Sequence, residues 1–396
     1  MFDAKDRRFM KKALALAKKG LGLASPNPCV GCVVVQGRAV VGSGWHEYAL
    51  LDHAEVGALR EASERASGAT VYVTLEPCCF QGRTPPCVDR LIEAGVRRVV
   101  VGRVDPNPRV SGRGIELLRA AGIQVDVGLM QGECAEVIEP FACRITTGLP
   151  LVVSKVGMSL DGKIGTASRI DHWITSPEGR DFGQLLRLGA DALLVGAGTV
   201  LSDNPELTYR GTHRKAKPLT RVILDSELQV PSDARLFQTS PEAPVLIFCT
   251  RDAAQARRAE LEREGVEVLP VPSAGEELDL QMVLQELGQR GISEVLVEGG
   301  SRVHWSFLSS GLVDKFYFIV APLVLGGENA VPSIGGKGYE VVADAPRFRI
   351  RNSFYAGPDV VLETYPAFSR SIISPWLSSE ETPSGAQDLL RSSRRK

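Results

Sequence analysis

Apolar positions in residues 1–145 recur with two periods: every second residue in short runs, and every third or fourth residue between them. The short runs predict strands at 69–76, 96–102 and 123–128, and a β-hairpin at 32–44 with Gln36-Gly37 at its turn. The intervening segments predict helices at 53–66, 87–95 and 114–122. Strands that alternate with helices predict an α/β layer fold for this part of the chain.

The N-terminal segment predicts an amphipathic helix. Its apolar face holds Phe9, Met10, Ala13, Leu14 and Ala17. The segment is charged throughout and lacks the apolar core of a secretory signal, so we expect a cytoplasmic protein.

A second α/β unit is predicted after a linker at 144–150. It opens with the run at 150–162, and its later strands are expected at 191–196, 221–225, 244–249, 294–300, 315–327 and 360–365. We therefore place two domains at 1–145 and 146–365. Residues 366–396 are rich in Ser and Pro and end in basic residues, and their scattered apolar positions predict a disordered tail.

Length and charge narrow the function classes. A chain of 396 residues is too long for one ordinary core, which agrees with two domains. The net charge of −1 creates no field that would attract nucleic acid or an acidic membrane, so we expect neither as a partner. No charge-free window is long enough to cross a bilayer. Any anionic ligand must therefore be met by local arginines or lysines.

Candidate metal chemistry lies in the first domain. His53-Ala54-Glu55 starts a predicted helix, and a strand then leads to EPCCFQGRTPPC at 76–87. One His, two Cys and a nearby Glu are the arrangement of zinc deaminases. Three protein ligands leave a position for water, whose pKa zinc lowers towards ~7. Glu55 can take the proton of this water and deliver it to a departing amine.

The ligand set is predicted to be His53, Cys78 and Cys87. Gln81 stands where a second thiol would usually follow Cys78, and we expect Cys79 to point away from its neighbour. Thr84-Pro85-Pro86 predicts a helix start with Thr84 as N-cap, which would lower the pKa of the Cys87 thiol.

The C-x-x-C pair Cys29 and Cys32 is an alternative metal site. Cys32 enters an apolar strand, however, where a small buried hydrophobe is the ordinary expectation. Eight cysteines in a cytosolic chain favour metal binding or burial over disulfides, and Cys134, Cys143 and Cys249 have no obvious partners.

A family resemblance follows from motifs in both halves. The stretches PNPCVGCVVV, GWH, HAEVGAL, VTLEPC, GRTPPC and DPNP, in this order, resemble the deaminase half of the bifunctional riboflavin-biosynthesis deaminase–reductases. The segments KVGMSLDGKIGT, HWITS, DALLVGAGTVLSDNPELTYR, VILDS, VEGGSRVHWSFLSSGLVDKFYFIVAPLVLGG and GPDVVLE resemble the reductase half of the same family.

For the first half, the resemblance implies a cytidine-deaminase-like three-layer domain with one zinc ion per chain. Its substrate would be 2,5-diamino-6-(5-phosphoribosylamino)pyrimidin-4-one. The resemblance implies substrate contacts at Asn27 and His46 and a phosphate anchor at Arg83. Members of the family usually carry Ser and one or two His after the first ligand Cys, where this chain has Cys79-Phe80-Gln81.

For the second half, VGAGT at 195–199 and VEGGSR at 297–302 place glycines after apolar strands, which favours a nucleotide cofactor. The resemblance implies a dihydrofolate-reductase-like α/β domain that uses NADPH to reduce the ribosyl group to ribityl. The implied cofactor contacts are Met158, Trp173, Thr199, Asp203, Ser226, Gly300, Ser301, Arg302, Val303, His304, Trp305 and Ser306. The implied substrate contacts are Asp171, Arg187, Leu207, Arg210 and Glu298.

The second half also departs from the family pattern. Arg169-Ile170-Asp171 stands where Gly-Glu-Ser is common, and Asp171 would repel a substrate phosphate that it faced. Ser301-Arg302 stands where a Pro-Thr pair is more common after the glycines, and Arg302 could help to bind an anionic cofactor.

Two other functions compete with the riboflavin enzyme. One is a nucleic-acid or nucleoside deaminase with an added domain, and the other is a non-catalytic protein in which zinc is structural. The matched second half argues against the first, and Glu55 argues against the second. The sequence leaves the oligomeric state open, a homo-oligomer included.

Overall fold

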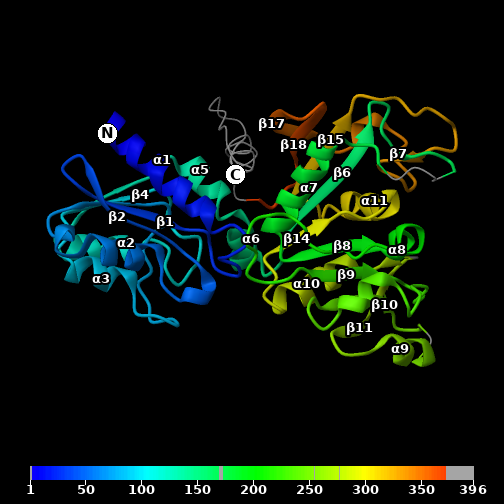
Figure 1. The fold of residues 1–396 in the computed structure, drawn as a ribbon, viewed down its shortest axis with the longest axis horizontal. Coiled ribbons are helices and arrows are strands. Elements are labelled where there is room, and N and C mark those ends of the chain that lie inside the picture. The colour runs from blue at the N-terminus through cyan, green and yellow to red at the C-terminus, as the bar shows by residue number, and fades with distance from the viewer. Residues whose placement is uncertain (1, 169–172, 254, 276, 372–396) are drawn as a thin grey trace. The chain divides into compact units, whose positions relative to one another are not determined.

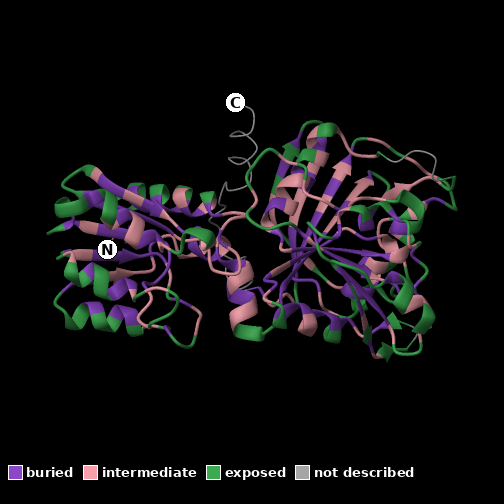
Figure 2. Ribbon diagram, turned by 60° about the horizontal axis from the view of Figure 1, so that its bottom comes forward, coloured by how far each residue is buried: buried purple, intermediate pink, exposed green. Residues whose placement is uncertain are grey.

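The computed structural model describes residues 2–168, 173–253, 255–275 and 277–371. The chain divides into two compact units, one of Met1–Gly148 with Arg214–Ala216 and the other of Leu149–His213 with the residues from Lys217 on. Within each unit, buried residues concentrate on the strands, while exposed residues lie on helices and loops (Figure 2).

The first unit contains a five-stranded sheet in the order β2-β1-β3-β4-β5 among the described residues. Strands β3, β4 and β5 are parallel, whereas β1 runs antiparallel to both of its neighbours. The strands are β1 Gly31–Gln36, β2 Ala39–Trp45, β3 Thr70–Val73, β4 Arg98–Val101 and β5 Gln124–Val127. The helices are α1 Ala4–Lys19, α2 Ala54–Ala62, α3 Cys87–Glu93, α4 Arg113–Ala120, α5 Gln131–Glu136 and α6 Glu139–Thr147.

Helices cover both faces of this sheet, which gives three layers (Figure 1). Helices α1 and α5 pack on one face, and α2, α3 and α4 pack on the other. The backbones approach closely: a Cβ on Gly31 would lie 2.0 Å from the carbonyl oxygen of Ala13, and one on Gly44 would lie 2.2 Å from that of Ala54. The expected layer fold is confirmed, as is the buried face of α1.

Three local predictions were wrong. The hairpin turn is Gly37-Arg38, because Gln36 still pairs with Ala39 and Gly37 takes the positive φ that the turn needs. The expected linker at 144–150 is largely the last turn of α6, which ends at the left-handed Gly148. Helix α3 begins at Cys87, after Pro86 in an extended conformation, and not at Thr84.

The second unit is built on a nine-stranded sheet in the order β11-β10-β9-β8-β14-β6-β15-β18-β17 within the described part of the chain. The strands from β11 to β15 in this order are parallel, and β18 and β17 add an antiparallel edge. The sheet strands are β6 Leu151–Ser159, β8 Ala192–Gly196, β9 Thr220–Leu224, β10 Val245–Thr250, β11 Val266–Val271, β14 Glu294–Val297, β15 Lys315–Ala321, β17 Phe348–Ala356 and β18 Asp359–Pro366. The short strands are β7 Lys163–Gly165, β12 Ser273–Ala274, β13 Glu277–Leu278 and β16 Val331–Pro332.

Helices also lie on both faces of this sheet. They are α7 Pro177–Gly189, α8 Ala197–Asp203, α9 Gln255–Leu261, α10 Leu280–Gln289 and α11 Ser301–Ser309. Helices α10 and α11 pack into the core with Phe316 of β15. The ring of Phe182 on α7 instead meets Tyr317, the next residue of β15, whose side chain points to the opposite face. A mixed α/β architecture is therefore confirmed for the second unit.

The end of the described chain packs onto the second unit. Strand β18 continues to Pro366, and the Arg370 guanidinium donates to the Asp314 carboxylate at 2.6 Å. The rest of the expected tail, residues 372–396, lies outside the described residues. In the described ranges, no helix combines the length and the apolar character needed to span a bilayer.

Candidate active sites

His53, Cys78 and Cys87 come together at one edge of the first sheet. His53 is the N-cap of α2, Cys78 follows β3 on a loop, and Cys87 opens α3. His53 Nδ1 lies 3.1 Å from Cys87 Sγ and 3.5 Å from Cys78 Sγ. Where residues are described, this is the one group of His, Cys and acidic side chains whose ligand atoms all lie within 4.8 Å of one another.

The helix start acts on Cys78 and not on Cys87. The backbone N–H of Cys87 points out of the first turn of α3 towards Cys78 Sγ at 3.3 Å. The Cys87 thiol, His53 and this N–H together lower the pKa of Cys78 to about 4. The hydrogen bond to Cys78 and burial raise the pKa of Cys87, contrary to our expectation.

The donor set suits a zinc ion. One imidazole nitrogen and two thiol sulfurs, this closely spaced, can be bridged by zinc with bonds of about 2.0–2.3 Å. A zinc ion prefers this mixture of nitrogen and sulfur, whereas magnesium or calcium would require oxygens. Cys79 stays outside the group, and its Sγ instead points to the carbonyl oxygen of Arg109 at 3.8 Å.

Neither cysteine of the alternative pair, Cys29 and Cys32, belongs to the three-residue cluster found among the described residues. Cys32 is fully buried among the apolar side chains of β1. Cys32 is therefore a core residue, as we expected from its place in an apolar strand.

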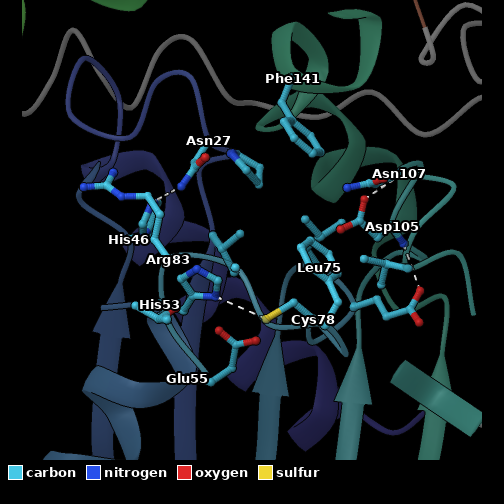
Figure 3. Close-up of a pocket in the computed structure, with 18 residues that line it drawn as sticks. Asn27, His46, His53, Glu55, Leu75, Cys78, Arg83, Asp105, Asn107 and Phe141 are labelled. Carbon is cyan, nitrogen blue, oxygen red and sulfur yellow. Dashed lines mark hydrogen bonds between the residues drawn. The ribbon is translucent and has the colours of Figure 1, made fainter. Parts of the chain in front are cut away.

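Glu55 lies in the first turn of α2 beside the cluster. Glu55 is only 3% exposed, and its carboxylate interacts with the Cys87 side chain. Burial raises the pKa of Glu55 to about 7, although His53 opposes the shift. Figure 3 shows its carboxylate directed towards His53 and Cys78.

A cavity of about 220 Å³ opens over these residues. Its floor is formed by His53, Glu55 and Cys78, and its apolar wall includes Leu75, Phe80 and Phe141. Polar side chains reach it from several loops, as Figure 3 shows. The further polar lining residues are Asn27, His46, Glu76, Arg83, Thr84, Asp105 and Asn107.

Two expected substrate residues, Asn27 and His46, are hydrogen-bonded to each other. Asn27 Nδ2 lies 3.0 Å from His46 Nε2, and His46 Nδ1 lies 2.8 Å from the carbonyl oxygen of Asp52. The carbonyl can only accept, so Nδ1 donates and Nε2 accepts from Asn27. Burial lowers the pKa of His46, which favours this neutral ring.

Arg83 is exposed on the loop between Cys78 and Cys87, and it also lines the cavity. Its guanidinium lies over the Tyr48 ring at 4.4 Å. The ring limits the motion of the side chain and leaves the N–H groups free to meet an anion.

The sequence reasoning missed Asp105 and Asn107 as lining residues. Both belong to the DPNP motif that follows β4, and the side chain of Asp105 accepts from the backbone N–H of Asn107 at 2.8 Å. Burial raises the pKa of Asp105 to about 7. The motif was a usable signal, but the position of its loop depends on Glu76, whose carboxylate accepts backbone N–H groups of Asp105, Gly112, Gly114 and Ile115.

The second unit has a charge cluster at the carboxyl end of β14, in which the side chains of Lys155, Arg187 and Glu298 are 19%, 13% and 9% exposed. The Glu298 carboxylate accepts two hydrogen bonds from the Arg187 guanidinium, at 2.9 and 2.8 Å, and Lys155 Nζ lies 3.3 Å away. Burial alone would raise the pKa of Glu298, but Lys155 and Arg187 lower it to about 2. Of these three, only Lys155 was not among the expected site residues.

The two glycine-containing turns are neighbours. Thr199 follows β8, Gly300 follows β14, and the Gly300 N–H donates to Thr199 Oγ1 at 3.2 Å. Because β8 and β14 are adjacent and parallel, both turns lie at the same edge of the sheet. The next backbone N–H groups belong to the first turn of α11, a suitable place for a phosphate.

The other expected cofactor residues lie on several elements of the second unit. Ser226 follows β9, Met158 is half-buried near the end of β6, Asp203 is exposed at the end of α8, and Trp173 is 69% exposed. Arg302 is exposed in the first turn of α11.

Part of the expected 300–306 stretch faces inwards. His304 is 1% exposed and shares a hydrogen bond of 2.7 Å with Ser154 Oγ, and Ser306 donates to the carbonyl oxygen of Arg302. The side chain of Trp305 packs on Tyr339, and that of Ser301 lies close to Gly335. The half-buried Val303 packs against the core. We therefore expect His304 and Ser306 to contribute backbone, and not side chains, to any ligand site.

The remaining expected substrate residues lie near Arg187. The Arg187 guanidinium also donates to the carbonyl oxygen of Thr208 at 2.7 Å, next to the buried Leu207, and the backbone N–H of Arg210 donates to Gln184. Asp171 lies outside the described residues, as do Arg169 and Ile170.

Two family models match the chain, one in each unit. Residues 3–103 match the cytidine and deoxycytidylate deaminase zinc-binding region, and residues 150–362 match the RibD C-terminal domain.

Curated relatives match along almost the whole length. The riboflavin biosynthesis protein RibD of Actinobacillus pleuropneumoniae is 42% identical over 358 residues, which cover 90% of this chain and 94% of the relative. The protein of the same description from Escherichia coli K12 is 40% identical over 368 residues, with 90% and 98% covered.

Solved structures agree with both units. RibD of Acinetobacter baumannii, form 1, matches with a TM-score of 0.81 at 37% identity, covering 91% of this chain and 99% of that one. A diaminohydroxyphosphoribosylaminopyrimidine deaminase/5-amino-6-(5-phosphoribosylamino)uracil reductase of Thermotoga maritima matches with a TM-score of 0.80 at 36% identity and the same coverage.

Proposed function

The chain belongs to the RibD family of riboflavin biosynthesis proteins, and from this premise we propose how its residues perform two consecutive reactions. It is a bifunctional enzyme: a zinc-dependent deaminase in the first unit and an NADPH-dependent reductase in the second. The observation that carries the first activity is the convergence of His53, Cys78 and Cys87 beside the buried Glu55.

The proposed substrate is 2,5-diamino-6-(5-phosphoribosylamino)pyrimidin-4-one. The reductase would then act on the deaminated product and convert its ribosyl group to ribityl phosphate. The deaminase relative of Thermotoga maritima carries both activities in its description, and it covers the two units of this chain together. A nucleic-acid deaminase or a non-catalytic zinc protein would not explain that coverage.

His53, Cys78 and Cys87 would hold the zinc ion. When bound, zinc supplies the Lewis acid that makes water a nucleophile near neutral pH. The low pKa of the Cys78 thiol favours the thiolate that a metal requires. Glu55, buried next to the cluster, accepts the proton of the attacking water and passes it to the departing amine.

The rest of the cavity orients the substrate. Asn27 and the neutral His46 form a fixed pair on one side, and Asp105 and Asn107 offer polar groups on the other (Figure 3). Arg83 supplies a guanidinium for the phosphate, as the near-neutral net charge of the chain requires a local cation.

In the second unit, NADPH supplies the hydride when bound. The turn of Thr199 and Gly300 and the start of α11 would receive its phosphates. Glu298 holds Arg187 and Lys155 in place, so that both cations can face a phosphorylated sugar at the end of β14. Leu207 and Arg210 would border the same substrate.

A single incubation tests both activities. The full chain, loaded with zinc, is mixed with the diaminopyrimidine ribosyl phosphate, with and without NADPH, and the products are identified by mass. We expect exchange of one amine for oxygen without NADPH, and a further gain of two hydrogens when NADPH is present. Reduction of the undeaminated pyrimidine at a similar rate would contradict the proposed order.

A further inference from the structure

Two consecutive residues of the loop after β3, Cys79 and Phe80, contact the same arginine. Cys79 Sγ points to the carbonyl oxygen of Arg109 at 3.8 Å. The Arg109 guanidinium lies over the Phe80 ring, 4.0 Å from its centre. The loop after β3 and the loop after β4 are therefore joined through Arg109.

Phe80 lines the cavity above Glu55 and Cys78, whereas Arg109 is exposed and does not line it. Because the guanidinium occupies one face of the ring, Phe80 can offer only its other face or its edge to a ligand. A cation at this distance also restricts the rotation of the ring, since a guanidinium over an aromatic face is attracted by its electrons.

Arg109 is also tied to a polar lining residue. Its backbone N–H donates to the Asn107 side-chain oxygen at 3.0 Å, and Asn107 in turn donates its own N–H to Asp105. One exposed residue therefore contacts Phe80 through its side chain and Asn107 through its backbone.

We propose that Phe80 is a substrate-contacting wall of the deaminase pocket and that Arg109 is a positioning residue that holds this wall in place. Its place in the cavity supports the assignment, because Phe80 lines it together with Cys78, a proposed zinc ligand, and Arg83, the proposed phosphate contact. The substrate is then bordered by the free face or the edge of the Phe80 ring. This inference rests on the deaminase function proposed above.

Ammonia release without NADPH tests the inference on the full zinc-loaded chain. We expect Arg109→Ala to raise KM about two- to fivefold, the range for one cation–π contact near the surface, with kcat little changed. Arg109→Lys keeps a cation over the ring and should restore most of the affinity. Removal of the wall in Phe80→Ala should raise KM by about tenfold or more.

The decisive comparison repeats Arg109→Ala in a Phe80→Leu chain, which keeps an apolar side chain and avoids a large cavity. Because Arg109 acts through the ring, its substitution should then leave KM unchanged. An equal rise of KM in both backgrounds, or no rise in either, would overturn the proposal.

Controls separate this inference from other failures. Zinc content and thermal midpoint are measured for each variant, and Arg97→Ala removes an exposed arginine of the same unit that does not line the cavity. We expect no change in KM for Arg97→Ala. If the unaltered chain releases no ammonia from the diaminopyrimidine, the proposed function itself is wrong.

Discussion

Each unit contains a glutamate with little exposure at its candidate site, and the pKa values of the two are shifted in opposite directions. Burial raises the pKa of Glu55 to about 7. Burial acts in the same direction on Glu298, but Lys155 and Arg187 outweigh it and lower the pKa to about 2. Burial alone therefore does not decide the charge of a carboxyl group, because nearby cations can outweigh it.

The difference matches the two kinds of chemistry. A group that accepts and releases a proton needs a pKa near the working pH, and burial gives Glu55 such a pKa. A group that fixes two cations must remain an anion throughout. We infer that Glu55 moves protons, whereas Glu298 is a permanent charge that organises its neighbours.

The largest expected effect concerns the ligands beside Glu55. Cys78→Ser should remove bound zinc and lower deamination by more than the roughly 10–100-fold loss typical of an outer-shell partner. Cys79→Ser is the matched control, because its thiol lies outside the cluster and should leave zinc and rate unchanged. Elemental analysis and ammonia release measure the two outcomes. Loss of zinc from the Cys79 variant, or its retention in the Cys78 variant, would show that the ligand set is wrong.

A second prediction tests the fixed charge of Glu298. At neutral pH, Glu298→Gln should lower the free energy of unfolding by about 1.5–3 kcal/mol, the scale of hydrogen bonds to a charged group, because Arg187 and Lys155 would lose their anion. Glu267→Gln is the control: it breaks an ion pair with Arg290 in which Glu267 is 57% exposed, so the loss should be about 0–1 kcal/mol.

The same variant has a predictable pH dependence. The folded pKa of Glu298 is below its unfolded value, so its contribution is complete above about pH 4.3 and is lost as the pH falls towards about 2. The stability difference between the unaltered chain and Glu298→Gln should therefore narrow in acid. Denaturant unfolding at neutral pH and near pH 3 measures it, and a constant difference would contradict the pairing.

A smaller effect is expected from Arg83, which acts on the substrate and not on proton transfer. Arg83→Ala should raise the KM of deamination by about tenfold, the scale of a lost hydrogen bond to a charged group. An analogue without the phosphate should show little difference between the two chains. Arg38→Ala, at the exposed hairpin turn, is the control. Equal losses for both substrates would argue against a phosphate contact.

The sequence predicted the site best where the residue types themselves indicate the chemistry. The grouping of His53, Cys78 and Cys87 follows from residue types that zinc requires, and the eight-residue gap between the cysteines is closed by a loop before α3. The face of α1 was also predictable, because its period is regular over the whole helix.

The misses depend on tertiary contacts. The Asp105 loop is positioned by the carboxylate of Glu76, which accepts four backbone N–H groups from a distant segment. The state of Glu298 depends on Lys155 and Arg187, which no local pattern places beside it. Helices α5 and α6 were not predicted, and the expected linker overlaps the last turn of α6.

The different roles of Glu55 and Glu298 are tested most directly by measuring both activities in two variants, Glu55→Gln and Glu298→Gln. We expect Glu55→Gln to keep its zinc and to lose about 10²–10⁴-fold in ammonia release, while NADPH oxidation with the deaminated substrate is unchanged. Glu298→Gln should lose NADPH oxidation and keep ammonia release. Full ammonia release by zinc-loaded Glu55→Gln, or the loss of both activities in either folded variant, would contradict the assignment of one proton carrier and one fixed anion.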